Sequence, residues 1–246
     1  MKSLGLVGFG QFGQLAAGVL KSHYDVLVTD VAPGAKAAAL AAGVAFGSLE
    51  AAAAREVVVV AVPVAAMRNV FATLAPHLKP GALVVDVGSV KMLPGQWMNE
   101  LLPDHVDIVA THPLFGPQSA KAGLEGLRFV ICPVRGDRHE RVAAFGRSLG
   151  LIVTVTSAEE HDREMAYVQA LTHLIGRSLV NLGIPDEQLK TASYQHLLEL
   201  CSLIGADTFE LFTAIQTQNP FAAEVASAFV DQARSLLDQV SAERPS

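Results

Sequence analysis

One histidine of this chain is well placed for acid–base chemistry. His112 stands in T-H-P-L-F-G-P, residues 111–117, directly after the apolar run Val106–Ala110. Such a run predicts a buried strand, so His112 should lie at the carboxyl edge of a sheet, where open α/β folds bind ligands. Pro113 restricts His112 to extended backbone angles, and a neutral imidazole held there could take a proton. Taken alone, His112 could equally be a hydrogen-bonded structural histidine.

Ser89 is expected at the same edge of the sheet. It lies in V-G-S-V-K, residues 87–91, which follows the predicted strand Ala82–Asp86. The alternative is that Ser89 caps the helical segment that comes after it, as serine often does.

A stripe of polar residues marks a later helical segment. Gln169, His173 and Arg177 are spaced four apart within His161–Arg177, which is otherwise rich in Ala, Leu, Val and Ile. Residues at this spacing share one face of a helix. Burial of such groups without partners is costly, so the face should meet a ligand or a partner chain. Ordinary solvent exposure is the alternative.

A glycine turn opens the chain. The sequence G-F-G-Q-F-G, residues 8–13, follows the predicted strand Ser3–Phe9 and precedes the helical segment Gln14–Lys21. This spacing predicts a dinucleotide site, because it allows a tight turn, a close approach of the backbone to a pyrophosphate and a helix amino terminus facing the phosphates. A purely structural glycine turn is the alternative.

Asp30 ends the second predicted strand, Asp25–Thr29, about 20 residues beyond the glycines, where a carboxylate can accept from a ribose 2′-hydroxyl. It would repel the 2′-phosphate of NADP, so we expect NAD, although the nearby Lys36 leaves NADP open. The residues expected to bind the cofactor are Gly8, Gly10, Gln11, Phe12, Gly13, Asp30, Val62 and Pro63.

The alternation of apolar runs and helical segments predicts the fold. The unbroken run Val57–Val62 suits a parallel strand buried on both faces, and further strands are expected at Phe129–Pro133 and Leu151–Thr156, with a helix over Arg138–Leu149 between them. We therefore expect an α/β, Rossmann-like doubly wound and mainly parallel sheet in a dinucleotide-binding domain, residues 1–156.

From residue 157 the pattern becomes helical. S-A-E-E, residues 157–160, has the form of a capping box, and no strand-like run follows it. Residues 157–246 should form an all-α substrate and dimerisation domain. Its helices are expected at His161–Arg177, Asp186–Leu203, Asp207–Gln216 and Ala222–Ser241.

Composition excludes several kinds of function. The chain has 246 residues, 51% of them hydrophobic, and a formal net charge of −6 without a basic tract, which disfavours nucleic acid or a membrane surface as partner. Two distant cysteines indicate neither a disulfide framework nor a metal site, and fit a cytoplasmic location. The glycine spacing and two glutamines argue against reading the amino terminus as a signal peptide. We expect no regulatory domain after the helices.

Three motifs together resemble the prephenate and arogenate dehydrogenase family of tyrosine biosynthesis. They are D-V-G-S-V-K at residues 86–91, T-H-P-L-F-G-P at 111–117 and the H-D…T-H helix at 161–173. The resemblance implies a homodimeric, NAD(P)-dependent oxidoreductase that decarboxylates a cyclohexadienol while hydride passes from its C4 to the nicotinamide. The resemblance implies that His112 is the base on the 4-hydroxyl. It also implies that Ser89 is a catalytic residue, which hydrogen-bonds in the cluster of His112 and this hydroxyl and orients it.

The second domain resembles plant-type arogenate dehydrogenases. T-H-L-I-G-R, residues 172–177, keeps His173 but has Gly176 where the common bacterial form has a second histidine, and the F-R-D motif of that form has no counterpart. The resemblance implies that Gln169, His173 and Thr191 hold the substrate, with Asp207 near its side chain.

Asp207 points to arogenate as substrate, because arogenate carries an ammonium where prephenate carries a keto group. If Asp207 merely caps the helix it begins, prephenate stays open, with 4-hydroxyphenylpyruvate as product.

Two other classes compete with this reading. A β-hydroxyacid dehydrogenase has a similar architecture but uses a catalytic lysine in a comparable helix, and residues 165–180 contain none. A non-catalytic dinucleotide-binding sensor would not need His112, Ser89 and His173 together.

Overall fold

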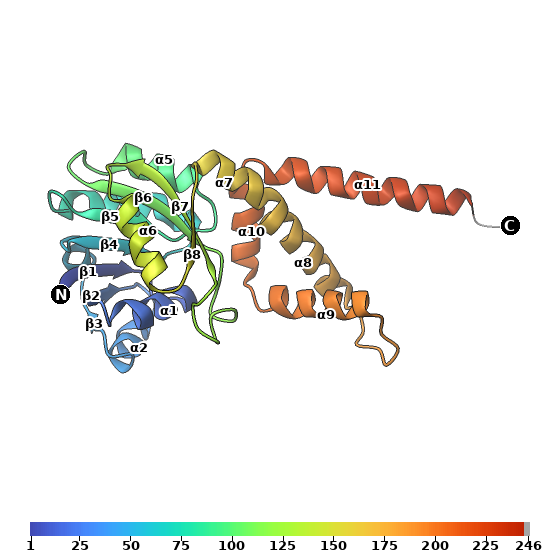
Figure 1. The fold of residues 1–246 in the computed structure, drawn as a ribbon, viewed down its shortest axis with the longest axis horizontal. Helices are drawn as coiled ribbons and strands as arrows, with labels where there is room; N and C mark the ends of the chain where they lie inside the picture. Colours follow the sequence, from blue (N-terminus) through green and yellow to red (C-terminus); the bar gives the residue numbers. More distant parts are fainter. Residues whose placement is uncertain (244–246) are drawn as a thin grey trace. The chain divides into compact units, whose positions relative to one another are not determined.

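The computed structural model describes residues 1–243, and its first part is an eight-stranded sheet with helices on both faces (Figure 1). In spatial order the strands are β3 (Ala45–Phe46), β2 (Tyr24–Thr29), β1 (Lys2–Val7), β4 (Val57–Val60), β5 (Leu83–Asp86), β6 (Asp107–Pro113), β7 (Arg128–Arg135) and β8 (Ile152–Val155). All neighbouring strands pair in parallel except β6 and β7, which are antiparallel. The predicted doubly wound, mainly parallel sheet is confirmed.

Alternation along the strands produces two apolar cores, one on each face of the sheet. In β4, Val58 and Val60 belong to one core and Val59 to the other, as expected for side chains that point to opposite faces in turn. The first core includes residues of α3 (Leu49–Ala53), α4 (Val64–Leu74) and α5 (Met92–Leu101), and the second includes residues of α1 (Gln11–Leu20), α2 (Ala35–Ala41) and α6 (His139–Ser148).

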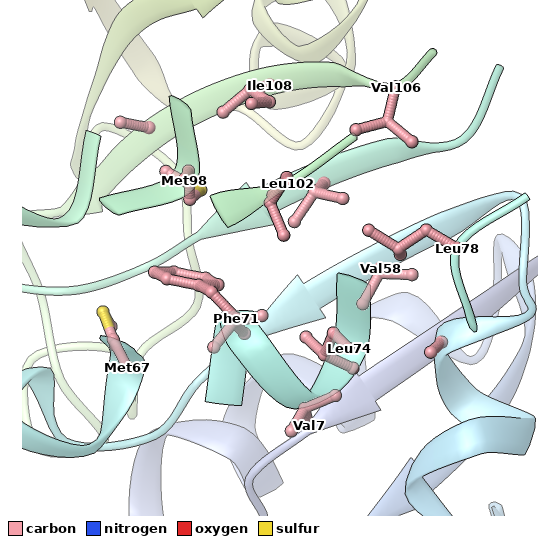
Figure 2. Close-up of a cluster of buried hydrophobic side chains, with 14 of the residues drawn as sticks. Val7, Val58, Met67, Phe71, Leu74, Leu78, Met98, Leu102, Val106 and Ile108 are labelled. Carbon is pink, nitrogen blue, oxygen red and sulfur yellow. The ribbon is translucent and has the colours of Figure 1, made fainter. Parts of the chain in front are cut away.

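Helix α4 supplies three large side chains to the first core. Met67, Phe71 and Leu74 are fully buried and recur at helical spacing, and Figure 2 shows Phe71 and Leu74 beside Val58. The short 3-10 segment η1 (Ala75–His77) follows α4. Removal of the Phe71 ring should cost about 3–5 kcal/mol, the usual range for a buried aromatic side chain.

Strand β6 is longer than the sequence predicted. It continues past Ala110 to Pro113, because Thr111, His112 and Pro113 pair with Ile131, Val130 and Phe129 of the antiparallel strand β7. His112 therefore lies within the last residues of a strand and not just beyond its end.

The chain divides into two compact units, Met1–His161 and the residues from Asp162 onward. The predicted boundary after residue 156 falls at the start of α7 (Ala158–Met165), and the units divide slightly later, inside that helix. The predicted capping box is present: the Ser157 hydroxyl accepts from the Glu160 amide at 3.1 Å, and the Glu160 carboxylate accepts from the Ser157 amide at 3.2 Å.

The second unit is helical, as predicted. After α7 come the π-helical segment η2 (Ala166–Leu171), α8 (Thr172–Leu182), α9 (Ala192–Gly205), α10 (Phe209–Gln218) and α11 (Ala222–Ala242). The predicted helix Asp186–Leu203 begins too early, because α9 starts only after Thr191, whose side chain accepts from the Tyr194 amide and caps the helix. Residues 184–191 are irregular, with a bend at Gln188 and Leu189.

Apolar side chains of the second unit are only partly covered. Its core contains Ala170, Ile215 and Ala222, whereas Phe229, Leu236 and Leu237 of α11 are exposed. Among the described residues, no helix is both long and apolar enough to cross a membrane.

Candidate active site

The glycine turn has the geometry that a dinucleotide requires. Gly8 has a φ of +102°, and a Cβ there would lie 2.4 Å from the carbonyl oxygen of Ala61. A Cβ on Gly13 would lie 2.2 Å from the carbonyl oxygen of Gly8, so this residue lets α1 approach β1. Gly10 faces open space and is the N-cap of α1 without a side-chain cap. The helix therefore offers free backbone amides to an anion such as a pyrophosphate.

The other predicted cofactor residues surround this turn. Gln11 and Phe12 lie in the first turn of α1, which begins three residues before the predicted start at Gln14. Val62 contacts the position that a Gly8 side chain would occupy, and Pro63 is the N-cap of α4. These residues fit a bound dinucleotide, whose phosphates the amino terminus of α1 would hold.

Asp30 follows β2 and is bound to the glycine turn. Its carboxylate accepts from the Phe9 amide at 2.5 Å and from the Ala32 amide at 2.6 Å. Its position at the carboxyl end of β2 is the one predicted for a ribose contact. Lys36 is exposed on α2.

A buried ion pair underlies the carboxyl edge of β5 and β6. The Lys91 ammonium donates to the Asp86 carboxylate and to the carbonyl oxygen of Thr111, and the side chains of Asp86 and Lys91 are fully buried. The Gly88 amide also donates to Asp86, at 2.8 Å. Burial raises the pKa of Asp86, while the Lys91 charge acts in the opposite direction. The pair fixes the backbone at Thr111, one residue before His112.

His112 is buried and paired with a second histidine. Its Nδ1 lies 2.9 Å from Nε2 of His161, which is the last residue of the first unit. Burial is the main reason that the pKa of His112 lies well below its ordinary value, and His161 and Lys91 act in the same direction. His112 is therefore neutral at neutral pH, the state in which an imidazole can accept a proton.

Ser89 lies on the loop between β5 and α5, at the same edge of the sheet as His112. It does not cap α5, whose N-cap is Lys91. Its buried hydroxyl oxygen has no hydrogen-bond partner among the described residues. An unsatisfied buried hydroxyl is costly, which fits a group that completes its hydrogen bonding with a ligand.

In the second unit, His173 and Asp207 lie close together. Nδ1 of His173 is 3.9 Å from the Asp207 carboxylate, and Arg177 donates to the backbone carbonyl of Asp207 at 2.7 Å. Burial lowers the pKa of His173; Asp207 opposes this effect and Arg177 adds to it. His173 is buried, so solvent exposure does not explain the polar stripe at this residue.

Gln169 and Thr191 differ in burial and in hydrogen bonding. Gln169 lies in η2, and its side-chain oxygen is buried without a hydrogen-bond partner among the described residues. Single π-helical turns are frequent at functional sites. Thr191 is exposed and caps α9, so its hydroxyl oxygen already accepts a hydrogen bond.

The sequence predictions omitted His161, Asp86 and Lys91 from the site. Two of the motifs contain them, but nothing local distinguishes a buried lysine or histidine from an exposed one. A lysine five residues after the acid that ends an apolar strand was the one available signal for the ion pair.

Comparison with known proteins identifies the family of the chain. Residues 16–155 match the family model described as prephenate dehydrogenase, nucleotide-binding domain, and residues 157–245 match the one described as prephenate dehydrogenase, dimerization domain. Arogenate dehydrogenase 2, chloroplastic, of Arabidopsis thaliana is 34% identical over 90% of this chain and 65% of its own length. A probable arogenate/prephenate dehydrogenase of Methanocaldococcus jannaschii is 31% identical over 95% of this chain and 55% of its own.

A solved structure shares the fold. Prephenate dehydrogenase from A. aeolicus, in complex with hydroxyphenyl propionate and NAD+, superposes with a TM-score of 0.80 at 20% identity, over 99% of this chain and 92% of that one. The chain spans less than two thirds of the length of the two relatives compared by sequence. Since the two family models together cover nearly all of it, the chain belongs to the prephenate dehydrogenase family.

Proposed function

We propose that this protein oxidises arogenate to tyrosine, with release of CO2 and hydride transfer to NAD. The observation that carries the proposal is the buried, neutral His112 at the carboxyl edge of β6, in the same unit as the glycine turn. A bound nicotinamide would accept the hydride from C4 of the substrate. The cyclohexadienol becomes aromatic as its ring carboxylate leaves, which provides the driving force.

In this reaction His112 takes the proton of the 4-hydroxyl as the hydride departs. The neutral imidazole is the competent form, and its low pKa keeps it neutral well below neutral pH. The hydroxyl of Ser89 has no protein partner among the described residues. It would hydrogen-bond in the cluster formed by His112 and the 4-hydroxyl of the substrate, and so orient these groups.

We assign substrate binding to Gln169, His173, Thr191 and Asp207 of the second unit. Asp207 is the specificity group, because its partly exposed carboxylate would pair with the ammonium of arogenate. Two observations support this role: Thr208 and not Asp207 caps α10, and Arg177 holds the Asp207 backbone. The hydroxyl oxygen of Thr191 already accepts a hydrogen bond as the cap of α9. Thr191 would therefore bind the substrate by donating its hydroxyl hydrogen.

NAD is the cofactor we propose, with NADP as the alternative. The carboxylate of Asp30 would accept from the ribose 2′-hydroxyl and repel a 2′-phosphate. We also propose a homodimer formed through the second unit, because α11 leaves apolar side chains exposed and the matching family model is a dimerization domain. The cytoplasmic location stays a prediction from cysteine usage.

The test is the initial rate of the purified protein with arogenate and with prephenate, each with NAD and with NADP. Strong preference for arogenate with NAD supports the proposal. Preference for prephenate would replace the substrate and make the product 4-hydroxyphenylpyruvate. No turnover in all four combinations would overturn the enzyme proposal in favour of a dinucleotide-binding sensor.

A further inference from the structure

His161 is held in place by the local structure at the start of α7. The amide of Thr156, after β8, donates to the carbonyl of Ile131 in β7 at 3.0 Å. The next residue, Ser157, forms the capping box with Glu160, and the amide of His161 donates to the Ser157 carbonyl at 3.0 Å. His161 thus sits on a helical turn whose position is set by a strand end and a cap.

The two imidazole rings meet edge to face inside the protein. Their centroids are 5.1 Å apart at an interplanar angle of 65°, and only 5% of His112 and 2% of His161 are exposed. At 2.9 Å, Nδ1 of His112 and Nε2 of His161 share one hydrogen, so one nitrogen donates and the other accepts. Which of the two nitrogens carries the hydrogen decides whether His112 can act as a base.

If His161 donated, the neutral His112 would carry its hydrogen on Nε2 and would have no nitrogen left to accept a proton. If His112 donates from Nδ1, its Nε2 has a free lone pair. We propose that His161 is a positioning residue that accepts this hydrogen, and so holds His112 in the one tautomer able to act as a base. This inference rests on the proposed function for its catalytic meaning, but the tautomer can be measured without turnover.

An imidazole partner differs from a carboxylate partner in its effect on basicity. A carboxylate that orients a histidine also favours its protonated form, whereas a neutral imidazole orients the ring without adding a negative charge. The titratable groups around His112 are His161 on α7 and the buried Asp86–Lys91 pair after β5. This arrangement fixes the ring and also leaves it neutral.

Two substitutions separate positioning from mere packing. His161→Leu removes the acceptor, and His161→Gln provides an amide oxygen near the place of Nε2. The Leu variant should lose about 10- to 100-fold in kcat, the scale seen when the orienting partner of a metal-bound histidine is removed, with KM little changed. The Gln variant should recover most of kcat.

The pH profile supplies a readout that packing alone would not move. The acidic limb of kcat/KM should shift to higher pH in both variants, because both remove the His161 ring, which contributes to the low pKa of His112. His105→Leu is the matched control. His105 lies two residues before the start of β6, whereas His112 lies near its end, and the His105 ring contacts only the backbone carbonyl of Leu78 among the hydrogen-bond partners described. This control variant should change neither kcat nor the acidic limb.

The nitrogen NMR spectrum of the wild-type imidazoles decides the tautomer directly. A His112 with protonated Nδ1 and unprotonated Nε2 at neutral pH supports the inference even if no substrate is turned over, in which case only the proposed function fails. A His112 protonated at Nε2 overturns the inference. So does the combination of a Gln variant that is no more active than the Leu variant and an acidic limb that shifts in neither variant. If the Leu variant does not fold, the Gln variant and this spectrum decide.

Discussion

The carboxylate of Asp207 lies 3.9 Å from Nδ1 of His173, too far for the two groups to share a hydrogen bond. Thr208 accepts from the Leu211 amide and caps α10, so the capping role considered for Asp207 is wrong. The pKa of His173 is lowered by burial, so the histidine is mostly neutral and does not neutralise the carboxylate. Asp207 thus keeps its charge available for a cationic ligand.

Asp207→Asn should lower kcat/KM for arogenate about tenfold or more while leaving prephenate unchanged or improved, because it removes a charge-assisted hydrogen bond worth about 1–3 kcal/mol. The measurement is the ratio of kcat/KM for the two substrates. Glu210→Gln, in the first turn of α10 and three residues after Asp207, is the matched control. An unchanged ratio would remove Asp207 from the specificity argument.

His112→Asn should lower turnover by about 10²–10⁴-fold, the usual effect of losing a general base. Affinity for NAD should not change, since the predicted cofactor residues lie on other segments. Steady-state rates and calorimetric titration with NAD measure the two effects. Full activity of this variant would refute the proposed mechanism.

Gly10→Ala and Gly13→Ala should separate cofactor binding from stability. A methyl on Gly10 meets open space, and its φ of −64° suits alanine, so stability should hold while NAD binding weakens. A methyl on Gly13 collides with the carbonyl oxygen of Gly8, so this variant should also unfold at lower urea concentration. Equal NAD affinity in wild type and Gly10→Ala would contradict the pyrophosphate site.

Lys91→Met should destabilise the first unit by about 3–5 kcal/mol, because it leaves the buried Asp86 carboxylate without its cation. Arg55→Met is the control, since it breaks the more exposed pair with Asp25 and should cost at most about 1 kcal/mol. Urea unfolding measures both. Similar losses in the two variants would show that burial does not dominate the energetics of the Lys91 pair.

Stability should decrease as pH falls below about 6.5, the ordinary pKa of histidine. Burial lowers the pKa of both His112 and His173 in the folded chain, so the unfolded chain binds more protons in this window and acid favours unfolding. Urea midpoints between neutral and mildly acidic pH test this. His112→Asn should flatten the decrease; an equally steep decrease would assign it to other groups.

Local sequence predicted those features of the fold that depend on single segments. Apolar runs marked the strands, the glycine spacing marked the first βα turn, and the capping box marked the start of α7. The extension of β6 to Pro113 depends on pairing with β7, which no local pattern reports. The helix predicted from Asp186 failed because good helix formers precede Thr191, the residue that caps α9.

The candidate site was predictable only where a motif concentrates its residues. His112, Ser89 and the glycine turn stand in compact motifs, whereas His161 is 49 positions from His112, and their contact exists only in the folded chain. The π-helical segment that carries Gln169 also escaped prediction, because a π turn leaves no distinct mark in apolar periodicity.

The interior position of β1 in the sheet has a consequence for the order of folding. This strand precedes the other strands of the sheet in the sequence, yet it pairs with β2 on one side and with β4, about fifty residues later, on the other. Parallel pairings of this kind join distant segments, which slows folding because long loops must close first. Until β4 has been synthesised, the edge of β1 that pairs with it has no partner, and an unpaired strand edge exposes the chain to aggregation.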